Sequence, residues 1–162
     1  MPSMVRTNKE FIAVYNRHVD TVYRLCFSFM KNRADAEDLV QETFLRLLSE
    51  RKVFENERHE KAWLIVTASN LCKDSLKKWW RRNENIEDIP SIGYEQTFAD
   101  PGILKAILSL KADYKTVVYM FYYEGYTTAE IAEHLNCPEA TVRSRLSRAR
   151  AQLRTLLGGE DR

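Results

Sequence analysis

Apolar residues at helical spacing fill most of this chain, and this pattern restricts the possible folds more than any other feature of the sequence. In the first block, from Phe11 to Met30, apolar side chains recur every three or four residues and predict one long amphipathic helix. Similar patterns predict helices over about 34–50, 59–82, 101–111, 114–124, 128–135 and 138–157. Since no stretch alternates as a strand does, we expect an all-α fold.

One segment interrupts the helical pattern. Residues 83–100 contain Pro90, Gly93, five acidic residues and no Lys or Arg. We therefore predict two small helical domains joined by a flexible acidic linker over 83–100. The first is an N-terminal helical bundle over 1–82, and the second is a C-terminal four-helix domain with a helix-turn-helix over 101–162.

The net charge of +2 conceals this division of the chain. Residues 1–82 hold 16 basic and 11 acidic residues, and residues 101–162 hold 9 and 7, so both domains are cationic and the linker offsets them. A near-neutral total therefore does not argue against nucleic acid as a partner, because the basic charge is concentrated locally.

Periodicity also predicts which side chains form the core. In the first helix the expected buried face is Phe11, Ile12, Tyr15, Val19, Val22, Tyr23, Cys26, Phe29 and Met30. In the second helix it is Leu39, Val40, Phe44, Leu47 and Leu48, and in the third it is Trp63, Leu64, Thr67, Leu71 and Leu76.

Cysteine and histidine usage excludes several classes of protein. The three cysteines are far apart and form no CxxC pair, which disfavours a disulfide scaffold or a zinc site and fits a reducing cytosol. The three histidines are scattered, with His18 expected on a helix surface. We predict no catalytic residue, no metal and no cofactor. Apolar runs far shorter than a membrane span predict no membrane insertion, and the first ten residues predict no signal peptide.

The sharpest local signal is a helix-turn-helix over residues 127–146. Thr127 or Thr128 is suited to capping a short helix, with Glu130 or Glu133 nearby, and Asn136 tolerates the left-handed conformation of a tight turn. Pro138 suits the first turn of the next helix. Ile131, Ala132, Val142 and Leu146 supply the buried contacts between the two helices.

The second helix of this motif carries five arginines and no acid between Arg143 and Arg154. Arginine binds guanine edges in the major groove or phosphates. A solvated basic helix end and a surface for a partner protein are the alternatives.

A second basic cluster ends the helix predicted over 59–82. Cations at Lys73, Lys77, Lys78, Arg81 and Arg82 surround the pair Trp79 and Trp80. Aromatic rings among cations suit single-stranded nucleic acid, because bases stack on rings while cations hold phosphates. The alternative is that a tryptophan covers the core and the cations are solvated.

Three motifs in this order resemble those of the extracytoplasmic-function sigma factors, the small two-domain sigma-70-type initiation subunits of bacterial RNA polymerase. Residues 35–47 resemble the helix that grips core polymerase. Residues 62–64 with Asn70, Leu71 and Asp74 resemble the promoter-melting helix, and residues 130–150 resemble the reader of the −35 element.

The resemblance implies DNA contacts at two places. The residues expected at the −35 element are Thr141, Arg143, Ser144, Ser147 and Arg148. The residues expected at the −10 element are Asn56, Arg58, His59, Asn70, Lys73, Lys77, Lys78 and Arg81, where the segment 53–61 captures a flipped base. Ordinary solvent exposure is the alternative for Asn70.

The resemblance also implies partner proteins and a bacterial cytoplasmic location. Core RNA polymerase is expected to bind Asp38, Gln41, Glu42 and Arg46, although helix capping also explains acids at this helix start. An anti-sigma factor is expected to hold the protein inactive. The acidic linker is expected near the polymerase channels, with a plain solvated tether as an equal alternative.

Two other classes of protein share parts of this pattern. A DNA-binding regulator that acts without polymerase needs the helix-turn-helix but not the motifs at 35–47 and 62–74. A helical adaptor that binds no DNA has no need of Arg143 and Arg148.

Overall fold

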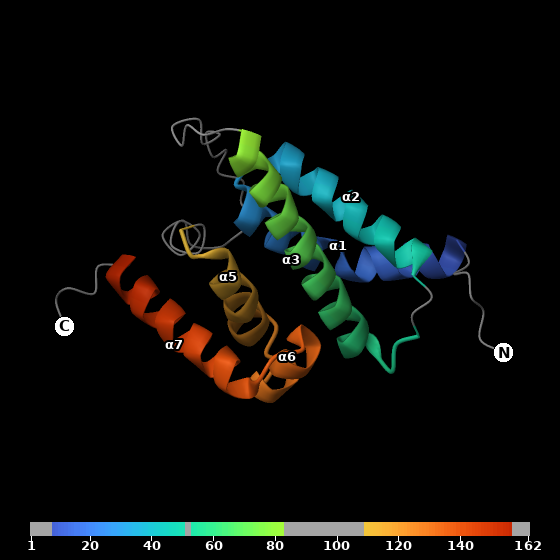
Figure 1. Ribbon diagram of the computed structural model, residues 1–162. Helices are drawn as coiled ribbons and strands as arrows, with labels where there is room; N and C mark the ends of the chain where they lie inside the picture. Colours follow the sequence, from blue (N-terminus) through green and yellow to red (C-terminus); the bar gives the residue numbers. More distant parts are fainter. Residues whose placement is uncertain (1–7, 51–52, 83–108, 157–162) are drawn as a thin grey trace. The chain divides into compact units, whose positions relative to one another are not determined.

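The computed structural model describes residues 8–50, 53–82 and 109–156 (Figure 1). Every regular element in these ranges is a helix, which confirms the predicted all-α class. The chain divides into two compact units, Met1–Ser91 and Ile92–Arg162. The predicted linker over 83–100 and residues 101–108 of the next predicted helix lie outside the described residues.

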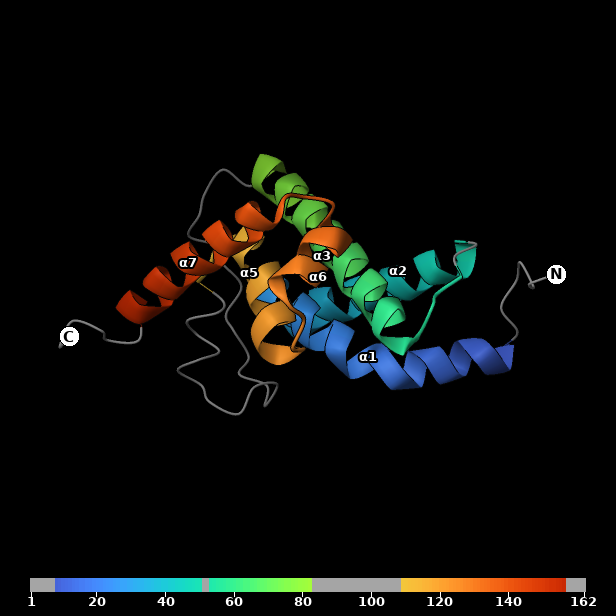
Figure 2. The same ribbon diagram turned by 90° about the horizontal axis from the view of Figure 1, so that it is seen from below.

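The first unit contains a bundle of three helices, α1 (Asn8–Met30), α2 (Arg33–Ser49) and α3 (Glu57–Arg82). Helix α1 packs against both α2 and α3, and α2 also packs against α3, as the two views in Figures 1 and 2 show. Because each helix contacts the other two, the apolar faces enclose one shared core.

A two-residue connection turns α1 back into α2. Lys31 has a φ of 66°, a left-handed conformation that few non-glycine residues adopt. Its side chain is partly buried, and this burial lowers the pKa of its amino group. Asn32 caps α2, because its side-chain oxygen accepts a hydrogen bond from the backbone N–H of Asp35 at 2.8 Å and its Nδ2 donates to the Asp35 carboxylate.

The predicted buried faces are correct in part. Val22, Cys26 and Phe29 of α1 are buried, as are Val40, Phe44 and Leu47 of α2. The prediction was wrong for Ile12, Tyr15 and Leu48, which are 56%, 38% and 43% exposed. Since α1 lies against two helices, its buried arc is wide and also takes in Val14, Leu25 and Phe27.

His18 corrects a second expectation, because it is buried and not on the surface of α1. Its Nε2 lies 2.9 Å from Oε1 of Glu60, a buried residue in the first turn of α3. Arg17 donates to the same oxygen at 3.0 Å. This cluster fixes the start of α3 against α1. The spacing of apolar residues in the sequence could not predict it, because all three residues are polar.

The second unit contains α5 (Ala112–Val118), the π-helical turn η2 (Tyr119–Tyr123), α6 (Thr128–Leu135) and α7 (Glu139–Leu156). Residues 114–124 were predicted as a single α-helix, but the helix widens at Tyr119. The Glu124 N–H bonds to the Tyr119 carbonyl five residues back, and the rings of Tyr119 and Tyr123 stack at 5.1 Å. Hydrophobic period alone does not distinguish this wider turn from α-helix.

The helix-turn-helix forms as predicted in its main features. Thr127 and Glu130 make a reciprocal capping box at the start of α6, and Asn136 ends α6 in the left-handed conformation with a φ of 56°. Ile131, Val142 and Leu146 are buried. Pro138 differs slightly, because it precedes α7 and its carbonyl accepts the first helical hydrogen bond.

None of the described helices is long and apolar enough to cross a membrane.

Replacing Glu60 by Ala should lower the free energy of unfolding of the first unit by about 2 kcal/mol, because the buried imidazole of His18 loses its hydrogen-bond partner and the exposed Arg17 loses its acceptor. Tryptophan fluorescence during urea unfolding of the full chain measures this, since Trp63, Trp79 and Trp80 all lie in α3. The exposed Glu55→Ala is the matched control, with an expected change within about 0.5 kcal/mol. Equal effects of the two substitutions would contradict the account.

Candidate nucleic-acid interface

Helix α7 presents a basic face opposite its buried face. Val142, Leu146 and Ala149 are buried at spacings of four and three, which directs the positions between them outward. Of the residues predicted at the −35 element, Arg143, Ser147 and Arg148 are exposed, and Thr141 and Ser144 are partly buried. All five predicted −35 residues therefore lie within residues 141–148, toward the N-terminus of α7.

A hydrogen-bonded chain joins α6 to this basic face. The hydroxyl of Thr128, the first residue of α6, donates to Oε2 of Glu139 at 2.6 Å. The same oxygen lies 2.9 Å from Nη2 of Arg143. The Thr128 hydrogen bond, followed by the charge of Arg143, holds the pKa of the Glu139 carboxyl below its ordinary value of 4.5. Neither this contact of Thr128 nor a role for Glu139 was predicted, although the i, i+4 spacing of Glu139 and Arg143 was a visible signal in the sequence.

A further arginine of α7 bonds to the π-helical turn η2. Arg150 donates from Nη1 to the hydroxyl of Tyr122 at 2.9 Å. Tyr122 lies in η2 and is 52% exposed, so the π-helical turn places an exposed aromatic side chain beside the basic helix.

The segment before α3 is shaped by its own side chains. Asn56 caps α3, because its side-chain oxygen accepts a hydrogen bond from the His59 N–H at 2.8 Å. His59 accepts from the Glu55 N–H at 3.2 Å, and Arg58 is exposed. The three predicted base contacts of this segment are therefore close together, but the oxygen of Asn56 already has a structural partner.

An aromatic cluster supports this segment. The ring of Phe54 lies 5.3 Å from the ring of His59 and 5.9 Å from that of Trp63. All three side chains are partly exposed. Phe54 was not among the predicted site residues, because its place in a short polar stretch gives no periodic signal.

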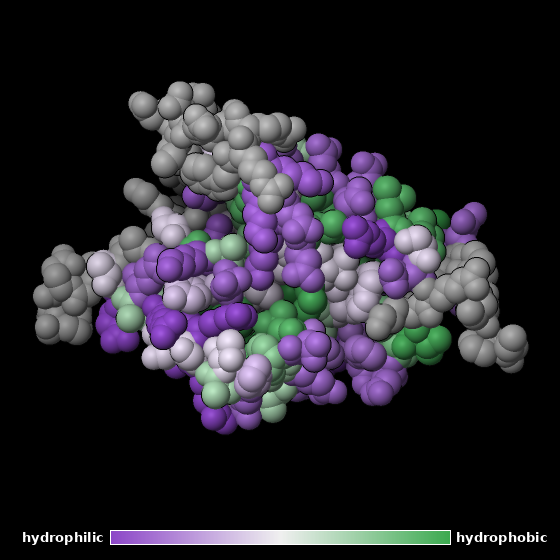
Figure 3. Space-filling view, viewed as in Figure 1, coloured by the Kyte–Doolittle hydropathy of each residue, from purple (hydrophilic) through white to green (hydrophobic). Residues whose placement is uncertain are grey.

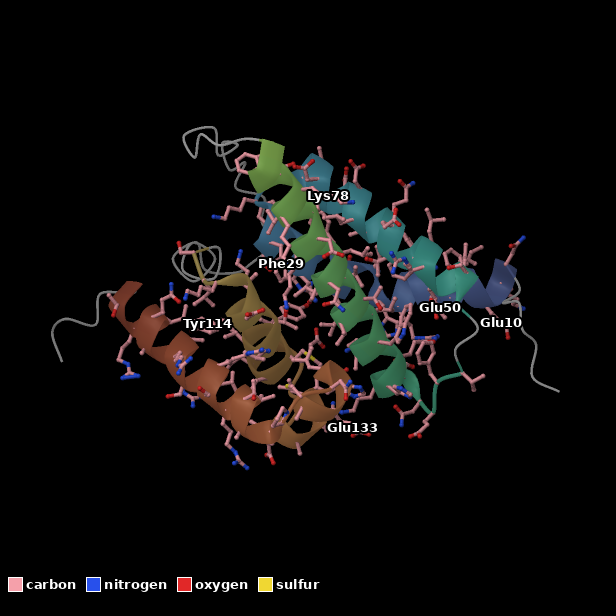
Figure 4. The ribbon with its side chains drawn as sticks, viewed as in Figure 1. Glu10, Phe29, Glu50, Lys78, Tyr114 and Glu133 are labelled. Carbon is pink, nitrogen blue, oxygen red and sulfur yellow. The ribbon has the colours of Figure 1, made fainter. Side chains whose placement is uncertain are left out.

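The C-terminal half of α3 carries the other predicted −10 residues. Asn70, Lys77 and Lys78 are exposed and Lys73 is partly buried, and Figure 4 labels Lys78 near the end of the helix. Ala68 and Cys72 on the opposite face are buried. The side chain of Arg81 lies outside the described residues.

Helix α2 has an exposed face that mixes polar and apolar side chains. The four residues predicted to bind polymerase, Asp38, Gln41, Glu42 and Arg46, are all exposed. Leu45 and Leu48 are exposed beside them, 54% and 43% respectively, and Figure 3 shows hydrophobic surface among the hydrophilic residues of this region. The apolar pair was not predicted as part of a site.

Within the ranges that the structure describes, no group of three or more His, Cys, Asp or Glu side chains is placed to hold a metal ion.

The two basic helices lie in regions that match known sequence families. Residues 14–82 match Sigma-70 region 2, and residues 102–153 match Sigma-70, region 4. The chain therefore belongs to the sigma-70 class of transcription factors.

Individual relatives show to which group of sigma-70 factors the chain is similar. The chain is 33% identical over 154 residues to the ECF RNA polymerase sigma factor SigL of Mycobacterium tuberculosis, covering 90% of this chain and 87% of the relative. It is 34% identical over 148 residues to RNA polymerase sigma factor SigV of Bacillus subtilis, covering 89% of each. The chain belongs to the extracytoplasmic-function (ECF) sigma factors.

A solved structure supports the same fold. The sigma factor RpoE from Bartonella quintana, in complex with the anti-sigma factor NepR, matches with a TM-score of 0.74 at 25% sequence identity, covering 92% of this chain and 97% of that one.

Replacing Thr128 by Val should raise the pKa of Glu139 toward 4.5, because the hydroxyl that stabilises the carboxylate is lost. A carbon-detected NMR titration of the Glu139 carboxyl in the full chain measures this. A group with a depressed pKa stabilises the fold above its unfolded pKa and loses that contribution as pH falls, so the α6–α7 contact should weaken below about pH 4.5. Thr128→Ser keeps the hydroxyl and should titrate as the wild type does. An unchanged titration in Thr128→Val would contradict the geometry.

Proposed function

We propose that this ECF sigma factor binds core RNA polymerase, directs it to promoters with −35 and −10 elements, and assists the melting of the DNA. The observation that carries the proposal is that each unit exposes one basic helix face, α7 in the region 4 match and α3 in the region 2 match. The chain itself contributes recognition, and the polymerase performs nucleotide addition. We place this activity in the bacterial cytoplasm.

The second unit binds the −35 element with α7 in the major groove. Arg143 and Arg148 are both exposed on α7 and have donors suited to guanine edges or phosphates. Ser144 and Ser147 supply hydroxyls on adjacent positions, and Thr141 lies near the helix N-terminus, where anions are favoured.

The first unit binds the −10 element with α3 and the segment before it. An unstacked base enters near Asn56, Arg58 and His59, where the partly exposed rings of Phe54 and Trp63 offer apolar surface for stacking. Lys77 and Lys78 follow on α3 and hold the backbone of the opening strand, together with Asn70, Lys73 and Arg81.

Helix α2 binds core polymerase with the face that carries Asp38, Gln41, Glu42 and Arg46. The exposed Leu45 and Leu48 favour a protein partner on this face over solvent or DNA, because apolar area beside charged residues is typical of protein interfaces. An anti-sigma factor competes for these surfaces; the RpoE–NepR complex, in which a 25% identical sigma factor binds such a partner, supports this part of the proposal.

Reconstitution with bacterial core RNA polymerase tests the proposal. The full chain should confer promoter-specific RNA synthesis, and the double variant Arg143→Ala with Arg148→Ala should reduce it at least about tenfold, because each lost base contact costs about 1–3 kcal/mol. Transcript yield on a promoter selected from a random library is the measurement.

Two comparisons make the result decisive. Lys9→Ala removes an exposed positive charge from α1 and should leave the yield unchanged. A chain that binds a palindromic duplex alone and adds no promoter specificity to core enzyme would be a polymerase-independent regulator. Unchanged yield in the double arginine variant would contradict the assignment of α7 to DNA.

A further inference from the structure

Glu139 places a carboxylate at the N-terminus of α7, the proposed DNA-binding helix, where a negative charge opposes DNA binding. It is the first residue of α7, and DNA phosphates repel carboxylates. A favourable interaction with the helix dipole accounts for an acid at this position in isolation. It does not account for two hydrogen-bonding partners that converge on one oxygen.

Those partners come from both helices of the motif. Thr128 donates from the first turn of α6, eleven positions before Glu139, and Arg143 contributes its Nη2 one turn further along α7. An isolated i, i+4 ion pair on a helix surface is weak, because two long side chains must be ordered to form it. Here the Thr128 hydroxyl already fixes the carboxylate, so Arg143 meets an acceptor held in place by the other helix.

This arrangement limits what Arg143 can bind. Its guanidinium is drawn toward the N-terminal end of α7, which is the end that reaches base edges in helix-turn-helix complexes. One nitrogen is engaged by Glu139, and the remaining N–H donors are free to make a bidentate contact. A guanidinium held this way is directed to a base edge, whereas a freely rotating one reaches the nearest phosphate.

We propose that Glu139, anchored by Thr128, is a positioning residue that makes Arg143 a reader of a guanine in the −35 element and prevents it from acting as a general phosphate contact. This inference rests on the proposed function and extends it to the sequence preference of the promoter. Glu139 thereby lowers the affinity for DNA of every sequence, because of its charge, and raises the preference for guanine at one position.

Glu139→Gln tests both effects, on guanine preference and on nonspecific affinity, in holoenzyme reconstituted from the full chain and bacterial core polymerase. The probe is a promoter library randomised across the −35 element, with transcript counts for each sequence. Preference for guanine at one position should fall about tenfold, the loss typical of a bidentate contact. At the same time, binding of the chain to a nonspecific duplex should tighten, and its salt dependence should steepen by up to about 0.9 in log–log slope.

Matched variants separate positioning from charge and from stability. Glu133→Gln removes an acid from an exposed position of α6, labelled in Figure 4, and should alter salt dependence without altering base preference. Thr128→Val should lose part of the guanine preference, and Thr128→Ser should keep it. In an Arg143→Ala background, Glu139→Gln should have no further effect on preference, since the two residues act as one unit.

The possible outcomes distinguish failure of the role proposed for Glu139 from failure of the proposed promoter recognition. Wild-type holoenzyme with no −35 preference overturns the proposed function and the inference with it. A wild-type preference that Glu139→Gln leaves unchanged overturns the inference alone. A uniform loss across all sequences, with no gain in nonspecific binding, makes Glu139 a structural residue only and also overturns it.

Discussion

Burial of one face of α3 and one face of α7 is the constraint on which the rest of the structure depends. In α7, Val142, Leu146 and Ala149 are buried, and in α3 Ala68 and Cys72 are buried. An amphipathic helix fixed by its apolar face has no rotational freedom left, so its polar positions are directed outward at defined angles. Hydrophobic packing therefore determines where each unit presents cations.

Polar contacts then fix the N-terminal ends of these two helices more closely than hydrophobic packing does. The buried Glu60 fixes the start of α3 through His18, and Glu139 fixes the start of α7 through Thr128. Both acids lie in the first turn of a helix that we propose contacts DNA, and both bond to a different helix of the same unit. The two units thus use the same device, a first-turn carboxylate bound across a helix–helix contact, in one case buried and in the other near the surface.

The fold class, the six α-helices of the described ranges and the turn at Asn136 were predictable, because helical period and turn chemistry are local properties of sequence. Surface exposure of Ile12 and burial of His18 were not, since both depend on which helices pack together. The π-helical turn was missed because a segment of five residues is too short for its hydrophobic pattern to differ from that of an α-helix. For the site, the exposed position of Arg143 followed from the helix-turn-helix pattern, but its bond to Glu139 depends on how Thr128 of α6 approaches α7.

Permanganate mapping of open promoter DNA tests the central claim most directly, namely that the two basic helices hold DNA at two separate places. Wild-type holoenzyme should give reactive thymines at the −10 element and nuclease protection at the −35 element. Lys77→Ala with Lys78→Ala should reduce the thymine reactivity several-fold and leave the upstream protection in place, because the two contacts lie in different units. Loss of upstream protection in that variant, or reactivity equal to wild type, would contradict the account.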